Sequence, residues 1–125
     1  EYKASSMKNE PQVDHIFARS ILKKQKVQSE ESGRMVQRYY KWEIDQLANC
    51  MLLPAHENGA GDKSDKPLHL WLQDKNKEFL VLHCIPLNKS LWVPERYNEF
   101  IKSRQALILK KFQGMDLLDK EKEYQ

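Results

Sequence analysis

Five side chains of the sequence can act together on a phosphate ester. Asp14 and His15 are adjacent, Asn49 and Asn58 lie nine residues apart, and Lys63 follows the second asparagine. A carboxylate offers the hard oxygen that Mg²⁺ prefers, and a neutral imidazole can take a proton from water. Alone, an Asp-His dipeptide is common, and its ordinary interpretation is a surface aspartate beside a hydrogen-bonded histidine. The surrounding residues decide between the two readings.

The sequence around these residues resembles HNH nucleases. The segment QVDHIFARSIL is similar to their first motif, commonly Asp-His-Ile-x-Pro-x-Ser. The segment IDQLANCMLLPAHENGAGDKSDKP is similar to the second motif, an Asn that opens an apolar strand, a short turn, another Asn and then a Lys. The spacing of Asn49 and Asn58 matches the HNH domain of the CRISPR RNA-guided nucleases, which also carries a Lys-Ser-Asp like Lys63-Ser64-Asp65.

The later part of the chain resembles a second group of proteins. From KPLHLWL to IPLNKSLWVPERYNEFIKSRQALI it is similar to the C-terminal HNH domains of prokaryotic two-domain restriction and phage-defence proteins, whose other half is a ParB-like domain. The resemblance covers about residues 12–118. It implies an α+β fold with a ββα-metal (HNH) motif in a mostly helical single domain, between a lead-in at 1–11 and a tail at 119–125. We therefore expect the C-terminal domain of a longer protein.

The resemblance also implies a role for each residue of the site. Asp14 and Asn58 would bind one Mg²⁺ or Mn²⁺ through oxygen, which suits the ligand preference of these cations. His15 would be the general base that activates water for attack on the phosphate. Asn49 would complete the catalytic set as a structural member, whose side-chain amide holds the loop that carries His15.

Two cations are implied to contact the substrate backbone. These are Lys63 and, as its helper, Arg19. The sequence departs from the family pattern near both of them. Ala18 stands where the family favours Pro, Ala48 replaces the usual Gly before the first Asn, and four residues separate Asn58 from Lys63 where the family usually has two.

These residues together predict an HNH endonuclease that hydrolyses phosphodiester bonds in DNA, expected to be double-stranded. We expect the nuclease domain of a cytoplasmic restriction or phage-defence protein, with a ParB-like domain N-terminal to it. The alternative is a non-catalytic nucleic-acid-binding or interdomain assembly module that keeps the fold. The intact set of Asp14, His15 and Asn58 favours catalysis, since a decayed site usually loses one member.

Composition agrees with a folded domain. Of the 125 residues, 40% are hydrophobic and 31% charged, which is too apolar for a disordered chain, and no run approaches the roughly 18 apolar residues of a membrane span. The net charge of +3 is a weak hint of a polyanionic partner, and basic runs at 19–26 and 102–111, the second including Arg104, can neutralise phosphates. Cys50 and Cys84 stand apart in apolar segments and are expected to be free thiols.

Two strands and a helix must position the site. Short apolar patterns predict strands at 12–17 and 49–53, and the site forms only if these strands meet. Proline suits the first position of a helix, so Pro54 is expected to begin the helix that carries Asn58.

Other patterns predict the rest of the domain. Apolar residues spaced by three and four predict an amphipathic helix at about 33–47, and further helices are expected to begin at Pro67 and Pro94. Gly114 is the expected C-cap of the last helix, and residues 79–82 fit either a strand or a helix. Three tryptophans are expected in the core, namely Trp42, Trp71 and Trp92.

Overall fold

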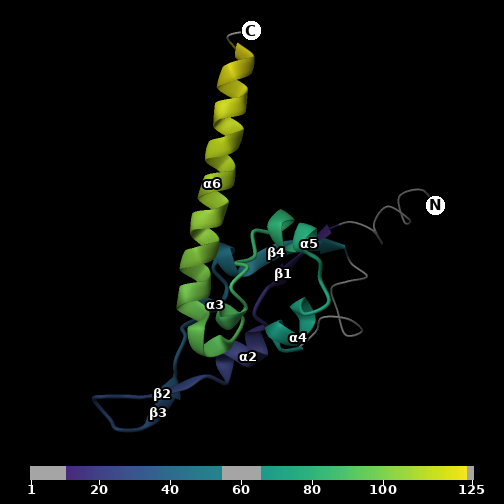
Figure 1. Cartoon of the computed structure of the whole chain (residues 1–125). Coiled ribbons are helices and arrows are strands. Elements are labelled where there is room, and N and C mark those ends of the chain that lie inside the picture. The colour runs from purple at the N-terminus through teal and green to yellow at the C-terminus, as the bar shows by residue number, and fades with distance from the viewer. Residues whose placement is uncertain (1–10, 55–65, 124–125) are drawn as a thin grey trace, which may run out of the picture.

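The computed structural model describes residues 11–54 and 66–123, with side chains described for 12–53 and 66–114. Short helices and two small antiparallel sheets surround the lower half of one long C-terminal helix, α6 (Tyr97–Glu123) (Figure 1). Helices make up most of the secondary structure, so the expected α+β fold is confirmed. No helix in the described ranges is long and apolar enough to cross a membrane.

The first sheet joins two strands that are far apart in the sequence. β1 (Pro11–His15) pairs antiparallel with β4 (Cys50–Pro54), and His15 lies opposite Cys50. Leu53 on β4 is fully buried, so one face of this sheet covers the core. The predicted meeting of the two strands is confirmed.

The segment between these strands differs from the sequence-based expectation. It forms α2 (Arg19–Lys23), β2 (Lys26–Gln28), β3 (Met35–Gln37), α3 (Lys41–Ile44) and the 3₁₀ turn η1 (Leu47–Asn49). The amphipathic helix predicted at about 33–47 is therefore wrong. Gly33 adopts a φ of 71°, a conformation that favours glycine. It closes the turn after which β3 runs antiparallel to β2.

The C-terminal half is helical and mostly as predicted. It contains α4 (Leu68–Leu72), α5 (Lys77–Leu82), the 3₁₀ turns η2 (Lys89–Leu91) and η3 (Pro94–Arg96), and α6. The ambiguous residues 79–82 are helical, and the Asn76 side chain caps α5 by accepting a hydrogen bond from Phe79 N. The C-cap predicted at Gly114 is wrong, because α6 continues to Glu123. A single glycine costs a helix only about 1 kcal/mol, which its neighbours can outweigh.

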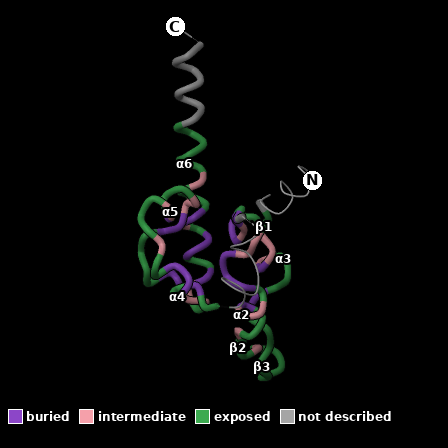
Figure 2. Tube along the Cα trace, turned by 90° about the vertical axis from the view of Figure 1, so that its right-hand side faces the viewer, coloured by how far each residue is buried: buried purple, intermediate pink, exposed green. Residues whose placement is uncertain are grey.

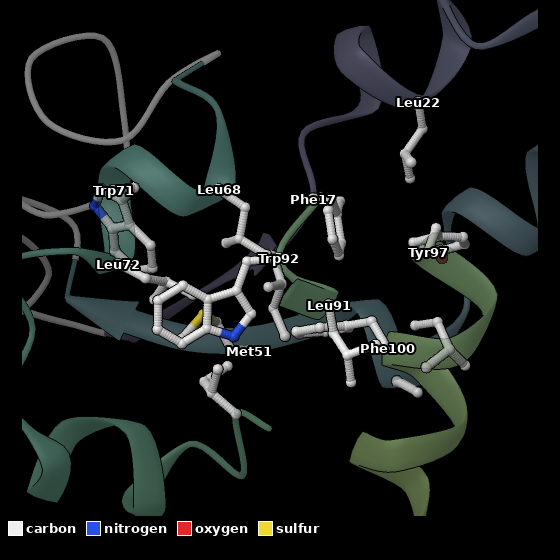
Figure 3. Packing of buried hydrophobic residues seen from close by; sticks show 14 of the residues in the cluster. Phe17, Leu22, Met51, Leu68, Trp71, Leu72, Leu91, Trp92, Tyr97 and Phe100 are labelled. Carbon is white, nitrogen blue, oxygen red and sulfur yellow. The ribbon is translucent and has the colours of Figure 1, made fainter. Parts of the chain in front are cut away.

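The core lies between the β1–β4 sheet, α4 and the first turns of α6 (Figure 3). Phe17, which follows β1, packs edge-to-face against two aromatic rings of α6. Its ring centroid lies 5.4 Å from that of Tyr97 and 5.0 Å from that of Phe100. Edge-to-face pairs of this kind are favoured by the ring quadrupoles. The turn after His15 is thereby anchored to α6.

Tryptophan burial follows the prediction at two of three positions. Trp71 and Trp92 are buried, and Trp92 Nε1 donates to the carbonyl oxygen of Pro86 at 2.8 Å. Trp42 is 70% exposed, so its expected place in the core is wrong. The four-residue α3 buries Ile44 and turns Trp42 outward. Cys50 and Cys84 are free, as predicted.

Candidate active site at the β1–β4 sheet

The register of the β1–β4 sheet fixes the directions of the Asp-His pair. Asp14 lies opposite Met51, and His15 lies opposite Cys50. Since neighbouring residues of a strand point to opposite faces, the side chains of Asp14 and His15 leave different faces of the sheet. The chain bends only after the pair, at residues 16–17. Strand pairing therefore extends through both residues.

Asn49 ties the bend after His15 to the start of β4. Its side chain is fully buried, and its Oδ1 accepts a hydrogen bond from Phe17 N at 2.9 Å. Its Nδ2 donates to the carbonyl oxygens of Phe17, at 3.2 Å, and Ile44, at 2.9 Å. The Asn49 carbonyl in turn accepts from Ile16 N at 2.7 Å. Asn49 thus holds the backbone on the C-terminal side of His15 with both atoms of its amide.

His15 has a partner that the sequence did not indicate. Its Nε2 lies 2.8 Å from Oδ1 of Asp45, the residue that follows α3, and Arg19 Nε donates to the same oxygen at 2.9 Å. The hydrogen bond with His15, and after it the contact with Arg19, lowers the pKa of Asp45. The Asp45 carboxylate is therefore ionised near neutral pH and can only accept. It follows that His15 Nε2 carries a proton and that the lone pair of the neutral ring lies on Nδ1.

The sequence did not indicate Asp45 because its carboxylate meets the imidazole across thirty residues of chain, through the tertiary fold. One signal was present. Asp45 lies four residues before Asn49, and Asn49 was already expected beside the loop of His15. A carboxylate so close to that asparagine is a natural candidate to meet the imidazole.

Arg104 corrects another expectation. The sequence placed it in a basic run able to contact phosphates, but its side chain is buried. Its Nη1 donates to the carbonyl oxygen of Ala48 at 3.0 Å and its Nη2 to that of His83 at 3.1 Å. Burial lowers the pKa of Arg104. The guanidinium therefore links α6 to the residue before Asn49 instead of facing a substrate.

The metal ligands implied by the sequence fall partly within the described residues. Asp14 is half-buried on β1, whereas Asn58 and Lys63 lie outside the described residues. Within the described ranges, no group of three or more His, Cys, Asp or Glu side chains could hold a metal ion. Mg²⁺ is commonly held by one or two carboxylates and keeps several waters. The Asp14 carboxylate with an amide oxygen fits that preference better than the nitrogen and sulfur set of a zinc site.

Comparison with known proteins relates the chain to a family of restriction-endonuclease domains. The family described as GmrSD restriction endonucleases, C-terminal domain, matches residues 1–111. No curated protein and no solved structure matches the chain. The matched range contains every residue that the sequence singled out for the site.

Proposed function

The chain belongs to the family of C-terminal domains of GmrSD restriction endonucleases, and from this premise we propose that it hydrolyses phosphodiester bonds of duplex DNA with the help of Mg²⁺ or Mn²⁺. Membership confirms the resemblance to restriction proteins and identifies a nuclease domain related to restriction endonucleases, with DNA as the implied substrate. The dependence on a cation and the role of each residue are the proposed part. So are action in the cytoplasm and recognition of the DNA by a ParB-like domain of the same protein.

The hydrogen bond between His15 and Asp45 carries the proposal. A carboxylate that accepts from one ring nitrogen orients the imidazole, fixes its tautomer and stabilises the imidazolium that forms when the ring takes a proton. With Nε2–H held by Asp45 at 2.8 Å, His15 would accept a proton from water at Nδ1. The water oxygen would then attack the phosphorus. A histidine held in this way supports catalysis over a purely structural domain.

Arg19 would assist at the same place. Its Nε is committed to Asp45, yet its side chain is 54% exposed, so the remaining guanidinium donors can face a phosphate. Guanidinium groups bind phosphate oxygens through paired donors. The single guanidinium of Arg19 would thus both hold the Asp45 carboxylate in place and contact the substrate backbone.

Asp14 and Asn58 would hold the cation. When bound, Mg²⁺ or Mn²⁺ offsets negative charge on the phosphoryl oxygens and on the departing 3′ oxygen. In an in-line displacement the attacking and leaving oxygens lie on opposite sides of the phosphorus. Because the Asp14 and His15 side chains leave opposite faces of the sheet, one phosphate would reach both only at the end of β1, where the chain bends after His15. Lys63 would add a contact to the substrate backbone.

Plasmid nicking tests the proposed function directly. The chain should convert supercoiled plasmid to open circles with Mg²⁺ or Mn²⁺ and should stop when the cation is chelated. Isothermal titration with Mn²⁺ should detect binding to the parental chain and lose it in Asp14→Ala, because Asp14 supplies the only full negative charge among the proposed ligands. Unchanged Mn²⁺ affinity in Asp14→Ala would remove Asp14 from the metal site.

A further inference from the structure

The connection between the two strands of the site contains an exposed two-stranded ribbon, formed by β2 and β3 and their turn. It projects from the body of the domain, at the end opposite the C-terminus (Figures 1 and 2). All six residues of its strands are exposed, including Val27, Met35 and Val36. A two-stranded hairpin that buries no face is marginally stable by itself in water. The exposed faces of the ribbon therefore indicate a surface that meets a partner.

The charge of this region indicates what kind of partner. Residues 19–42 contain seven lysines and arginines against two glutamates, a net charge of +5. Because the whole chain has a net charge of +3, the remainder is net negative, at −2. All seven cations are exposed. The ribbon itself, residues 26–37, is neutral, because Lys26 and Arg34 are balanced by Glu30 and Glu31 in its turn. The positive charge is concentrated at the base of the ribbon, on Arg19, Lys23, Lys24, Arg38 and Lys41, where it favours a polyanion.

Both ends of the ribbon lead into the candidate active site. Arg19 begins α2, which runs into β2, and Asp45 follows α3 after β3. Arg19 Nε and Asp45 Oδ1 are 2.9 Å apart, and the same oxygen holds His15. This contact closes the base of the ribbon next to the imidazole. A long polyanion positioned for attack at His15 would therefore pass the base of the ribbon.

Both faces of the ribbon carry cations. In the register of β2 and β3, Lys26 lies opposite Gln37, which places both on one face. Arg34, Val36 and Arg38 follow one another at intervals of two residues. Because Gln37 lies between Val36 and Arg38, these three residues lie on the face opposite to Gln37. An object that fills a groove needs contacts on both sides, and the major groove of B-DNA, about 12 Å wide, admits a two-stranded ribbon.

We propose that the β2–β3 ribbon binds duplex DNA beside the cleaved phosphate, with Lys26, Arg34 and Arg38 at backbone phosphates. This inference rests on the proposed function and adds a binding surface outside the catalytic set. Its contribution is affinity, because contacts to phosphates position a duplex without reading its sequence. The ribbon would hold the substrate while His15 and the cation act on one bond.

The test measures DNA binding without cleavage. Fluorescence anisotropy of a labelled duplex is recorded in chelator over a range of salt concentrations, for the parental chain and for the ribbon triple variant Lys26→Ala, Arg34→Ala, Arg38→Ala. The matched control removes the same charge elsewhere, at the exposed Lys66, Lys77 and Lys89. We expect the Kd of the ribbon variant to rise about tenfold or more, and its salt slope to fall by about 2 to 3, since each lost phosphate contact removes about 0.9 from the slope. The control should stay within about twofold of the parental Kd.

A second measurement needs no variant. Acetylation of the parental chain, followed by mass spectrometry, should show Lys26 protected by the duplex while Lys77 and Lys89 stay reactive. A folded ribbon variant with the parental Kd and salt slope, or a Lys26 that the duplex leaves unprotected, would overturn the proposal and point to a protein partner for the ribbon. Failure of the parental chain to bind any duplex would instead contradict the proposed function itself.

Discussion

Nε2 of His15 and Oδ1 of Asp45 lie 2.8 Å apart, although thirty residues separate them in the chain. The contact joins the end of β1 to the turn after α3 and depends on the pairing of β1 with β4. Because Asp45 also accepts from Arg19, one carboxylate organises both side chains expected to act on a phosphate. Because the ionised Asp45 carboxylate can only accept a hydrogen bond, this contact fixes the tautomer of the His15 imidazole.

Removing this carboxylate should slow cleavage without weakening DNA binding. We expect Asp45→Ala to lower the single-turnover cleavage rate by at least about 10-fold, because the imidazole loses the carboxylate that fixes its tautomer and orientation. The Kd for duplex DNA, measured in chelator, should stay the same or improve slightly because a negative charge is removed. Equal losses in the cleavage rate and in DNA affinity would instead mean that the role of Asp45 is only structural.

A double variant shows whether Asp45 acts by orienting His15 or contributes to cleavage independently of it. If Asp45 acts through His15, the variant with both His15→Ala and Asp45→Ala should cleave at the rate of His15→Ala alone, because coupled residues do not add. Two multiplied losses would show that Asp45 contributes by a route that does not involve His15. Thermal unfolding of all three variants provides the control for folding.

The lowered pKa of Asp45 also predicts how stability depends on pH. The hydrogen bond with His15 and the contact with Arg19 lower this pKa from an ordinary value of 3.8. A carboxyl with a lower pKa in the folded state stabilises it fully above the unfolded value and loses that effect as the pH falls through the folded value. Asp45→Asn should therefore unfold at lower urea than the parental chain at pH 7, and the gap should close below about pH 3.8. A gap that stays constant down to about pH 3 would contradict this account.

Replacing Asn49 should lower the free energy of unfolding, because its side chain bonds buried backbone groups. Asn49→Ala leaves one N–H and two carbonyl groups, those of Phe17 and Ile44, without their side-chain partner in a buried place. Each such group costs about 1–3 kcal/mol, so we expect a loss of at least about 2 kcal/mol in the free energy of unfolding. The surface variant Asn98→Ala is the matched control and should stay within about 0.5 kcal/mol of the parental value. Similar urea midpoints for the two variants would refute the buried role of Asn49.

The parts of the fold that were predicted from the sequence have strong local signals. The apolar runs around His15 and after Asn49 indicate strands, and the family resemblance requires that they meet. Pro67 and Pro94 mark the starts of helical segments because proline suits the first turn of a helix. Asn58 and Lys63 lie outside the described residues, so their roles stay predictions.

The parts that were missed depend on contacts between distant segments. Tyr39 fits the helical spacing at 33–47, yet it lies outside any helix and enters the core through contacts with distant residues. Its hydroxyl donates to the carbonyl oxygen of Pro94 at 2.8 Å, and its ring packs 5.0 Å from that of Tyr97. Arg104 was expected in a basic run that contacts phosphates, but it is buried and donates to carbonyl groups from two other segments. Such partners are set by the tertiary fold and leave no local pattern.

Single-turnover cleavage by His15→Ala tests the central claim most directly. One preparation should be measured for cleavage of a duplex with Mg²⁺ or Mn²⁺, for DNA affinity in chelator and for melting temperature. We predict a cleavage rate lower by at least about 10²-fold, the low end of what a positioned general base contributes, with DNA affinity and melting temperature close to the parental values. A folded, DNA-binding His15→Ala chain that cuts at the parental rate would contradict the proposed mechanism.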